Sequence, residues 1–473
     1  MAALAAVGFS AAPSAASAAP EICDVVVIGT GLAGHCAAIA AAEAGAGSVL
    51  MIDKAPLVGG HSALASGSIA FVDEKRQAAQ GIVDSFEKFL ADAKAVGGEI
   101  DEAMAGFMAE RSADGLDWLE AHGVRFAPKI FRAYGGLHPR CVTAFGNMGA
   151  RRYVSQLHGV AEELGISTRL LTCAAGLGQR ADGGYELEVS DERSKRKYTI
   201  YARSVVIASG GFGANLPLRM RYRPELDQDI PTTANPHGLL QDTATGDGLL
   251  LARRLGACWT NMSSIVLLSY WGGRMLDYIG AEIYVNTEGR RFVDETAATG
   301  RIAKAIAQLP ARSMFVITDA KSVKGVNVGT KLTAGSVHRS ESVAQMARGM
   351  NVPVQELEHT IEQYNRHARE NTPDAFGRRI YAQTIDTPPF YWGLERLMVH
   401  ATLGGLRTDT QARVLREDGS LIEGLYAAGE VVGGIWGGDR LGGAGLLQCL
   451  VLGRAAGQAA AERAVTNAAV PHV

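Results

Sequence analysis

DVVVIGTGLAG, residues 24–34, joins a run of apolar residues to the glycine pattern GxGxxG. The glycines of the pattern are Gly29, Gly31 and Gly34. Residues 24–28 are typical of a strand buried in a parallel sheet, because such strands are covered on both faces. Glycines after a strand allow a tight turn and let backbone amides approach a phosphate group closely. The segment therefore predicts the strand, turn and helix start of a nucleotide-binding unit.

The residues that follow complete a βαβ unit. An alanine-rich helix is predicted at 32–44 and a second buried strand at 48–52. Asp53 ends this strand, nineteen residues after Gly34. An acid at this distance accepts hydrogen bonds from ribose hydroxyls in dinucleotide-binding folds. The unit predicts a dinucleotide, and by itself it leaves NAD and FAD open.

Length and composition narrow the class of protein. The 473 residues exceed the ~250–300 that one core usually holds, so two or three domains are expected. Lys plus Arg (46) nearly balance Asp plus Glu (49), which argues against a nucleic-acid partner. No uninterrupted apolar stretch reaches the ~20 residues of a membrane helix, so no membrane span is expected. The six cysteines show no CxxC, CxxCH or zinc-type spacing, so no metal site or attached haem is expected.

Short glycine runs recur far along the chain. The first, GGHSALASGS at 59–68, lies just after the βαβ unit, and others lie at 209–211, 245–248, 433–434 and 442–443. Distant segments of this kind would have to converge on one long ligand. The pattern therefore favours an extended FAD over a nicotinamide nucleotide held by a single motif.

The chain is expected to divide into three parts. Residues 1–20 are predicted to be a leader or signal remnant, rich in Ala and Ser. Residues 21–264 and 400–466 are predicted to form the FAD-binding domain, and 265–399 an inserted capping domain. An Ala16-Ser17-Ala18 step suits signal cleavage, but no Lys or Arg precedes the apolar part. Export to a bacterial periplasm is favoured, and a cytoplasmic location stays open.

The fold class expected is α/β, with a Rossmann-like domain built from a parallel sheet and an antiparallel meander. Alternating stretches at 185–189 and 197–202 predict the meander, which leads into a buried strand at 205–208. The insertion is expected to be an α+β unit of helices and polar loops, with a helix at 354–370. A long helix of small residues at 446–464 closes the chain.

The motifs together resemble those of FAD-dependent oxidoreductases of the fumarate reductase and succinate dehydrogenase flavoprotein type, especially the soluble flavocytochromes and urocanate reductases. The resemblance covers residues 22–465. It rests on VVVIGTGLAG, GGHSALASGS, SVVIASGGFGAN, ATGDG, VNTEGRRFVDE, FGRR with TPPFYW, HATLGG, and GLYAAGEVVGG followed by GDRLGGAG. It implies hydride transfer between FAD and a carbon next to an electron-withdrawing group, beneath a capping domain that excludes water. No attached haem domain is expected.

The resemblance and the motifs give a set of expected FAD contacts. They are Gly29, Gly31, Leu32, Ala33, Gly34, Asp53, Lys54, Gly60, His61, Ser62, Ser66, Gly67, Ser68, Ser209, Gly210, Asp247, Gly429, Glu430, Gly445, Leu446 and Leu447. GGHSALASGS is similar to the segment in which membrane-bound succinate dehydrogenases carry a flavin-linked histidine. Noncovalent FAD is expected, as in the soluble relatives, and a covalent link to His61 stays open. The N-terminus of the last helix is expected to face the pyrimidine end of the flavin and to stabilise its reduced anion.

Three residues are implied to be catalytic by their places in the family motifs. His400 in HATLGG and Arg440 in GDRLGG match the donors that hold the substrate carboxylate, and such donors stabilise the charge that develops on hydride addition. Arg301, which follows the RFVDE segment, matches the residue that delivers the proton. The family's proton relay has no clear counterpart, and Arg274 and Asp277 are the nearest candidates.

One departure bears on the substrate. Fumarate reductases hold the second carboxylate with an HPT sequence and a Thr-Glu pair, whereas this chain has the apolar and aromatic stretch 264–271. An unpaired carboxylate in an apolar pocket costs free energy, so fumarate is not expected to be the best substrate. We expect one carboxylate or carbonyl and a less polar remainder that could include an aromatic group.

Two other functions remain open at this stage. An oxidase of amino or hydroxy acids, like the related aspartate oxidases, would release peroxide in air. A flavoprotein electron-transfer subunit would require a partner, since the chain has no motif for haem or clusters. In either case a small-molecule substrate and an external electron donor or acceptor are the expected partners.

Overall fold

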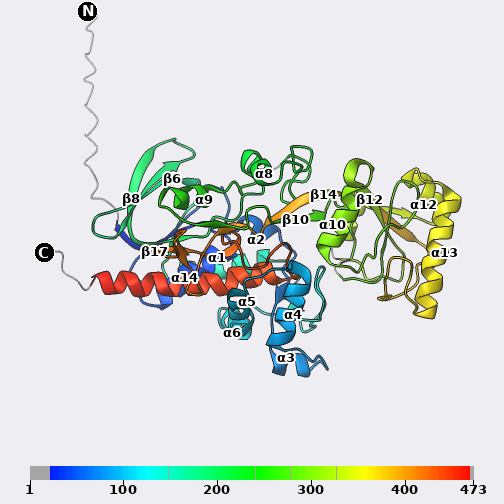
Figure 1. The fold of residues 1–473 in the computed structure, drawn as a ribbon, viewed down its shortest axis with the longest axis horizontal. Helices are drawn as coiled ribbons and strands as arrows, with labels where there is room; N and C mark the ends of the chain where they lie inside the picture. Colours follow the sequence, from blue (N-terminus) through cyan, green and yellow to red (C-terminus); the bar gives the residue numbers. More distant parts are fainter. Residues whose placement is uncertain (1–21, 147–148, 240, 277, 326, 469–473) are drawn as a thin grey trace, which may run out of the picture.

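The computed structural model describes residues 22–468, except 147–148, 240, 277 and 326. The predicted leader at 1–20 lies outside the described residues. The chain forms a larger part, which contains both ends of the described sequence, and a smaller part built from the middle of the chain (Figure 1).

An eight-stranded mixed sheet forms the centre of the larger part. Its order is β16-β17-β8-β1-β2-β5, and β7 pairs with β8 and with β6. The strands are β1 (Ile22–Ile28), β2 (Val49–Ile52), β5 (Ser167–Arg169), β6 (Thr172–Gln179), β7 (Tyr185–Asp191), β8 (Lys197–Ile207), β16 (Arg413–Leu415) and β17 (Leu421–Ala427). β1, β2, β5, β8 and β17 run parallel, whereas β6 and β7 form an antiparallel meander with β8. The α/β class and the predicted meander are present.

Two helices of small residues pack together beside this sheet. α1 (Leu32–Glu43) follows the first glycine motif, and α14 (Ala444–Ala468) is the long last helix seen in Figure 1. A Cβ atom added to Gly457 would lie 2.0 Å from the carbonyl oxygen of Ala37. The helices can approach this closely only because α14 has no side chain at that point.

Further helices and short strands surround the larger part. They are α2 (Gly60–Leu64), α3 (Glu74–Ala78), α4 (Phe86–Gly97), α5 (Glu102–Glu110), α6 (Ser112–Ala121), α7 (Arg151–Glu163), α8 (Leu216–Tyr222), α9 (Asp247–Arg254), β3 (Ile69–Ala70), β4 (Cys141–Val142), β9 (Trp259–Thr260) and β15 (Gly405–Leu406). Side chains of Asp73, Ser85, Asp101 and Asn215 accept hydrogen bonds from the first turns of α3, α4, α5 and α8. These caps fix where the helices begin.

The smaller part is built on a five-stranded antiparallel sheet. Its strands are β10 (Ile265–Ser269), β11 (Ile283–Val285), β12 (Ser313–Thr318), β13 (His338–Ser340) and β14 (Phe390–Thr402). Its helices are α10 (Thr299–Ala307), α11 (Val328–Ala334), α12 (Val343–Met350) and α13 (Val354–Glu370). β14 pairs with β12 and β13 near its start and with β10 near its end, so one strand runs from the smaller part into the larger.

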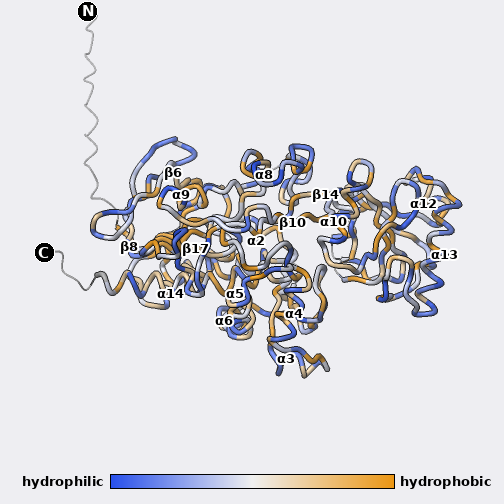
Figure 2. The backbone as a smooth tube through the Cα atoms, in the orientation of Figure 1, coloured by the Kyte–Doolittle hydropathy of each residue, from blue (hydrophilic) through white to orange (hydrophobic). Residues whose placement is uncertain are grey.

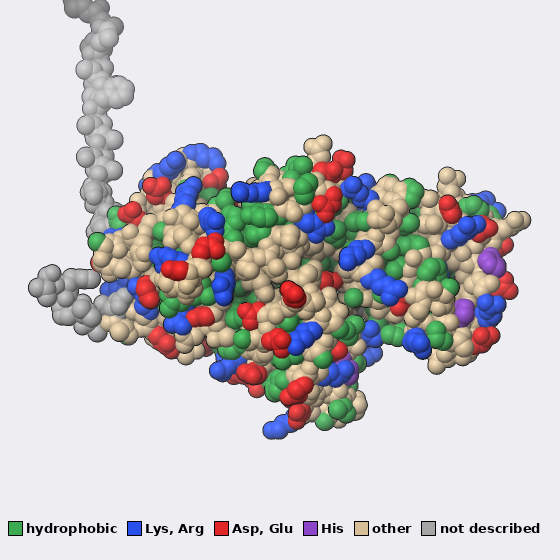
Figure 3. Space-filling model, in the orientation of Figure 1, with side chains coloured by type: hydrophobic (Ala, Val, Ile, Leu, Met, Phe, Trp, Pro, Cys, Tyr) green, Lys and Arg blue, Asp and Glu red, His purple; other side chains and the backbone are tan. Residues whose placement is uncertain are grey.

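The hydrophobic cores follow the same division. One core uses residues between Cys23 and Val266 together with residues between Val399 and Ala464, and two smaller cores lie between Met275 and Leu397. Hydrophobic segments gather in the interior of both parts (Figure 2). Positive and negative side chains are interspersed over the face shown in Figure 3. The domain limits at 264/265 and 399/400 stay predictions.

Several predicted elements match the observed ones and others need correction. α13 has the predicted bounds, and α1 and β2 agree to within one residue. The predicted stretch 197–202 and the buried strand predicted at 205–208 belong to one continuous strand, β8, which ends at Ile207 and pairs with β1 on both sides of residue 203. In the insertion, the expected helices and loops surround a five-stranded sheet, as suits an α+β unit. Within the described residues, no helix is long and apolar enough to cross a membrane.

Candidate active site

The glycine turn after β1 has the geometry that a bound phosphate requires. Gly29 has a φ of +113°, and a Cβ added there would lie 2.3 Å from the carbonyl oxygen of Ala208. A Cβ on Gly34 would lie 2.0 Å from the carbonyl oxygen of Gly29. In contrast, the nearest atom to a Cβ on Gly31 is Oγ of Ser62 at 3.5 Å. Gly29 and Gly34 are therefore needed for packing, whereas a side chain at Gly31 would meet the protein only at ordinary van der Waals distances.

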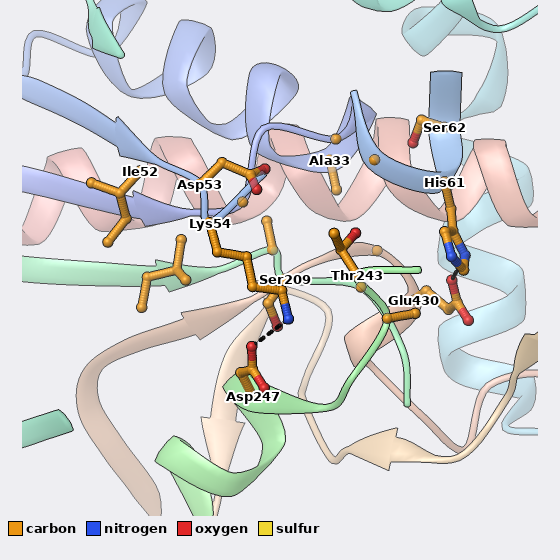
Figure 4. Close-up of a pocket in the computed structure, with 18 of the residues that line it drawn as sticks. Ala33, Ile52, Asp53, Lys54, His61, Ser62, Ser209, Thr243, Asp247 and Glu430 are labelled. Carbon is orange, nitrogen blue, oxygen red and sulfur yellow. Dashed lines mark hydrogen bonds and ion pairs between the residues drawn. The ribbon is translucent and has the colours of Figure 1, made fainter. Parts of the chain in front are cut away.

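A cavity begins at this turn, and the space between its lining residues is about 830 Å³ when the adjoining open solvent is included. Figure 4 shows its lining, with Asp53 and Lys54 toward one end and His61 and Glu430 toward the other. Fourteen of the predicted FAD contacts line it: Gly29, Gly31, Leu32, Ala33, Asp53, Lys54, Gly60, His61, Ser62, Ser209, Gly210, Asp247, Gly429 and Glu430. The cavity thus joins segments from four of the glycine regions.

The end near Asp53 is rigidly organised. Oδ2 of Asp53 accepts hydrogen bonds from the amide and the hydroxyl of Thr30, at 2.8 and 2.7 Å. The amide of Ala55 donates to Oδ1 at 2.9 Å. Nζ of Lys54 lies 2.6 Å from Oδ2 of Asp247 (Figure 4). The carboxylate of Asp53 is held at the end of β2, where the ribose of a dinucleotide is expected.

A buried polar atom without a hydrogen-bond partner is a second sign that the cavity fits FAD. Oγ of Ser209 is buried and has no hydrogen-bond partner among the described residues, although Ser209 lines the cavity. Buried hydroxyls are normally paired, so a free one in a cavity indicates a ligand that pairs with it. Gly31, which lines the cavity at the N-terminus of α1, adds backbone amides suited to a pyrophosphate.

The other seven predicted contacts lie outside the lining of this cavity: Gly34, Ser66, Gly67, Ser68, Gly445, Leu446 and Leu447. Gly34 packs inside the turn, and Ser66 is exposed. The carbonyl of Gly67 accepts a hydrogen bond from the hydroxyl of Tyr153 at 2.8 Å. The amide of Ala70, just beyond Ser68, donates to the carbonyl of Gly443 at 3.2 Å. The 66–70 segment and the start of α14 are therefore neighbours, and their FAD contacts stay predictions.

Ten lining residues were not foreseen from the sequence. They are Ile28, Ile52, Thr172, Cys173, Ala174, Ala208, Thr243, Ala244, Ala428 and Cys449. Most lie at the apolar ends of strands or next to the glycine motifs. Their position in the sequence beside those motifs was the one signal that could have identified them. Thr172 to Ala174 carry no motif. They reach the cavity because β6 starts beside Asp53, whose carbonyl accepts a hydrogen bond from the amide of Thr172 at 2.8 Å.

His61 is held between two carboxylates at the far end of the cavity. Its Nε2 lies 2.7 Å from Oδ1 of Asp242, and its Nδ1 lies 3.6 Å from Oε2 of Glu430. Burial opposes the charge on the ring, but the two carboxylates outweigh it and raise the pKa of His61 to about 10. His61 lowers the pKa of Asp242 to about 2 in return, against the effect of burial. The ring is an imidazolium across the neutral range.

His400 occupies an irregular point of β14. Val266 pairs with Ala401 and Leu267 pairs with Val399, so His400 is the extra residue of a β-bulge. Bulges re-aim a side chain and are common beside active sites. Nδ1 of His400 lies 3.0 Å from the hydroxyl of Thr233. Burial, with the nearby charge of Arg440, lowers the pKa of His400 to about 3, so the ring is neutral.

Arg440 lies at the start of α14. A Cβ added to Gly445 would lie 2.7 Å from Cζ of Arg440, so the guanidinium packs directly against the first turn of the helix. No carboxylate within the described part of the chain comes within 4.0 Å of its nitrogens. Burial lowers the pKa of Arg440, and an arginine nevertheless keeps its charge. Glu430 and Asp439 are the negative groups nearby, but neither forms an ion pair with Arg440, so its guanidinium beside a helix N-terminus is suited to an anionic ligand.

Arg301 is not brought into this group. Its side chain is exposed, and its Nη2 lies 3.5 Å from the carbonyl oxygen of Phe376. The preceding residue is anchored nearby, since the amide of Gly300 donates to Oδ2 of Asp439 at 2.8 Å. The backbone of α10 therefore reaches the loop that carries Arg440, while the side chain of Arg301 points elsewhere. Its proton-delivering role stays a prediction.

The two weaker relay candidates have different outcomes. The guanidinium of Arg274 stacks on the ring of Tyr134, with Cζ 3.7 Å from the ring centroid. Its Nη2 lies 3.5 Å from Oε1 of Glu282. This buried cluster joins the two parts of the molecule, because Tyr134 belongs to the larger part and Arg274 and Glu282 belong to the smaller part. Asp277 lies outside the described residues.

Comparison with known proteins settles the family. A family model described as "FAD binding domain" matches residues 24–446. A probable fumarate reductase of Shewanella frigidimarina is 33% identical over 464 residues, which cover 94% of this chain and 76% of that protein. The chain belongs to this family of FAD-binding flavoproteins. The cavity residues fit FAD, and the protein is an FAD-dependent oxidoreductase.

Other relatives support the same assignment. A urocanate reductase of Eggerthella lenta is 32% identical over 461 residues, covering 93% of this flavoprotein and 74% of the relative. The solved open conformation of a flavocytochrome c3 fumarate reductase superposes with a TM-score of 0.74 and 31% identity. It covers 94% of this flavoprotein and 79% of the solved chain. The α/β fold with an inserted capping part is therefore that of the family.

Proposed function

We propose that this flavoprotein reduces a carbon–carbon double bond conjugated to a single carboxylate or carbonyl group. The observation that carries the proposal is that His400, at the bulge of β14, lies near enough to Arg440, at the start of α14, for the charge of Arg440 to lower the pKa of His400. Both present donors, and Arg440 has no carboxylate partner within the described residues. Relatives named as fumarate and urocanate reductases support reduction of an enoate.

FAD, when bound, supplies the hydride that this reaction requires. The residues of the chain bind the substrate and stabilise the charge that develops on it. Arg440 binds the carboxylate or carbonyl oxygen, and the neutral ring of His400 donates to it from Nε2 when the hydroxyl of Thr233 donates to Nδ1. Negative charge develops on that oxygen as hydride adds to the carbon of the double bond that is farther from the carboxylate or carbonyl group. Donors already in place stabilise this charge without reorganisation.

A proton must then reach the carbon next to the carboxylate or carbonyl. The double bond gains one hydride and one proton, and the two electrons come from an external donor. Arg301 stays the proposed source of the proton. Its exposed side chain would have to turn from the carbonyl of Phe376 toward Arg440, and the anchored amide of Gly300 keeps its backbone close enough for this.

We infer that a second carboxylate is not the preferred feature of the substrate. The stretch that replaces the family's second carboxylate grip forms β10, where Ile265 and Val266 are buried. These residues offer no charge to a second carboxylate, whose burial without a partner would be costly. Fumarate is therefore proposed to be a poorer substrate than a monocarboxylate or an enone.

We also propose that FAD is held without a covalent link to His61. Both ring nitrogens face carboxylates, at 2.7 and 3.6 Å, and the ring is protonated at neutral pH. A protonated imidazole has no free lone pair to form a bond with the flavin. His61 instead places a positive charge at the Glu430 end of the cavity.

The test is turnover of the FAD-loaded protein with reduced viologen and a panel that contains crotonate, cinnamate, fumarate and a simple enone. Oxidation of the viologen by a monocarboxylate or enone, faster than by fumarate, is expected. No turnover with any member, from protein whose flavin is reducible, would contradict the proposal. Release of peroxide in air with amino or hydroxy acids would favour the oxidase alternative instead.

A further inference from the structure

The carboxylate of Asp439 connects the two parts of the molecule. Its Oδ2 accepts a hydrogen bond from the amide of Gly300, in the first turn of α10, at 2.8 Å. Its Oδ1 accepts a hydrogen bond from the amide of Arg440 at 2.8 Å. Gly300 belongs to the smaller part and Arg440 to the larger part, so one side chain holds the backbone of both. A Cβ added to Gly300 would lie only 3.0 Å from Oδ2, so the two parts meet closely at this point.

Asp439 caps α10 from the other part of the molecule. The residue before this helix is Ala298, whose side chain cannot accept a hydrogen bond. The first amides of a helix have no partner within the helix, and a carboxylate there is favourable because the N-terminus carries a partial positive charge. α10 lies at the junction of the two parts (Figure 1). A Cβ on Gly135 would lie 2.5 Å from Oγ1 of Thr299, so a second segment of the larger part packs against the same turn.

The loop that carries Asp439 is fixed on the larger part. The amide of Gly438 donates to the carbonyl of Gly97, at the end of α4, at 2.8 Å. Trp436 is buried, and its Nε1 donates to Oε1 of Gln448 on α14 at 2.7 Å. Asp439 therefore extends from a firmly held loop, and α10 is the element attached to it.

The contact with α10 also stabilises the carboxylate. Asp439 is buried, with 8% of its surface exposed, and it forms no ion pair within the described part of the chain. Burial raises its pKa, whereas the amides of Arg440 and Gly300 and the charge of Arg440 oppose that rise. A buried carboxylate without an ion pair depends on hydrogen bonds, so loss of the contact with Gly300 would leave Oδ2 unpaired until water reached it.

We propose that Asp439 is a positioning residue that holds the substrate-binding arginine and the proton source in a fixed relation. It binds the amide of Arg440 directly, and Arg301 follows Gly300 in the first turn of α10. This inference rests on the proposed function, from which it takes the roles of Arg440 and Arg301. A movement of the smaller part that separates Gly300 from Asp439 would release the start of α10 and the backbone of Arg440 together.

The first measurement does not depend on turnover. Hydrogen–deuterium exchange of the peptide 298–307, in FAD-loaded and oxidised protein, reports the cap on α10. We expect this peptide to exchange roughly 2- to 30-fold faster in Asp439→Ala, the factor that corresponds to a helix cap worth ~0.5–2 kcal/mol. Asp439→Asn keeps one acceptor oxygen and should restore part of the protection. Ser342→Ala removes a cap that lies within the smaller part, on α12, and should leave exchange of α10 unchanged.

The second measurement is turnover of crotonate with reduced viologen. Asp439→Ala should lower kcat/KM about tenfold, because small displacements of catalytic groups are costly. The ratio of kcat in H2O to kcat in D2O should rise in this variant, since delivery of the proton becomes the slow step. A helix cap of purely structural importance would not change that isotope ratio, and Ser342→Ala should keep the wild-type values.

Each outcome has a defined meaning. FAD content and circular dichroism establish that every variant is folded. Unchanged exchange of α10 in Asp439→Ala would overturn the connection between the two parts. Faster exchange with the kcat, KM and isotope ratio of the wild type would overturn the positioning role. Faster exchange that Asp439→Asn partly reverses, with no reduction of any enoate by the wild type, would retain the connection and refute the proposed function.

Discussion

Nε2 of His61 lies 2.7 Å from Oδ1 of Asp242, and Thr232 donates to the other oxygen of the same carboxylate at 2.5 Å. The next residue, Thr233, contacts His400. A short loop thereby connects the imidazolium at the end of the FAD cavity to the neutral imidazole proposed to bind substrate. Adjacent threonines therefore link a protonated and a neutral histidine, Thr232 through Asp242 and Thr233 directly.

Acid precipitation of the holoprotein tests how FAD is attached. Since both nitrogens of His61 face carboxylates, we expect yellow flavin in the supernatant and a colourless pellet, measured by absorbance near 450 nm after trichloroacetic acid treatment. Flavin that stays with the denatured wild-type chain, but is released from His61→Ala, would instead establish a covalent link.

The pH dependence of stability should report His61. Its folded pKa of about 10 is above the ~6.5 of an unfolded histidine, so its stabilisation is complete below ~6.5 and lost as pH rises through about 10. Urea unfolding at pH 7 and pH 10 should show a larger loss of unfolding free energy in the wild type than in His61→Gln. His359→Gln, on the exposed face of α13, is the control. Equal losses in wild type and His61→Gln would contradict the ion-pair assignment.

Arg440→Ala should lose activity without losing FAD. Removing one donor to a developing oxyanion costs ~2.7–4 kcal/mol in the transition state, or ~10²–10³ in kcat. The measurement is kcat with reduced viologen and the best enoate, beside the flavin content per chain. Arg454→Ala, an arginine later on α14 that pairs with Asp114, should retain activity. Wild-type kcat in Arg440→Ala would remove Arg440 from the site.

The pH profile of kcat/KM should lack a histidine limb near 6.5. Burial and Arg440 lower the pKa of His400 to about 3, so its ring is neutral throughout pH 5–8. Thr233→Val removes the hydroxyl on Nδ1 and should lower kcat by up to about tenfold, with FAD binding preserved, because one hydrogen bond contributes ~0.5–1.5 kcal/mol. A limb near 6.5 that disappears in His400→Gln would show that His400 titrates in the working range.

Replacing two glycines of the same motif by alanine should affect different properties, stability for one and FAD binding for the other. A Cβ on Gly34 would lie 2.0 Å from the carbonyl oxygen of Gly29, so Gly34→Ala should reduce stability by ~1–3 kcal/mol or more. A Cβ on Gly31 meets nothing closer than 3.5 Å, so Gly31→Ala should fold normally and bind FAD at least tenfold more weakly, since the methyl group occupies the pyrophosphate side. Thermal unfolding and flavin titration distinguish the two. The reverse pattern would contradict the assigned roles.

The elements that depend on local patterns were predictable from the sequence. β1, α1 and β2 follow from apolar runs and glycine spacing, and α13 follows from its helical periodicity. The strands predicted separately at 197–202 and 205–208 are one strand, β8, because pairing of Ala202, Ser204 and Val205 with β1 keeps the backbone extended between them. Short cap strands such as β11 and β13 have three residues each, too few for a periodic signal.

Site residues that belong to a sequence motif could be predicted. Residues that reach the site only through the three-dimensional fold could not. Glycines, Asp53 and Glu430 were found because each belongs to a motif. Asp242 and Thr233 were missed, since only the folded loop brings one to His61 and the other to His400. The bulge at His400 was equally hidden, because it depends on the register between β10 and β14.

β14 joins the sheet of the smaller part to His400, the histidine proposed to bind substrate, in one strand of thirteen residues. A rigid swing of that sheet must either bend the strand or carry His400 along with it. The bulge is the natural place for such bending, because the regular ladder is interrupted there. Bending at the bulge changes the position of His400 itself. A movement of the smaller part that exposes the flavin would therefore also move the imidazole proposed to bind the substrate.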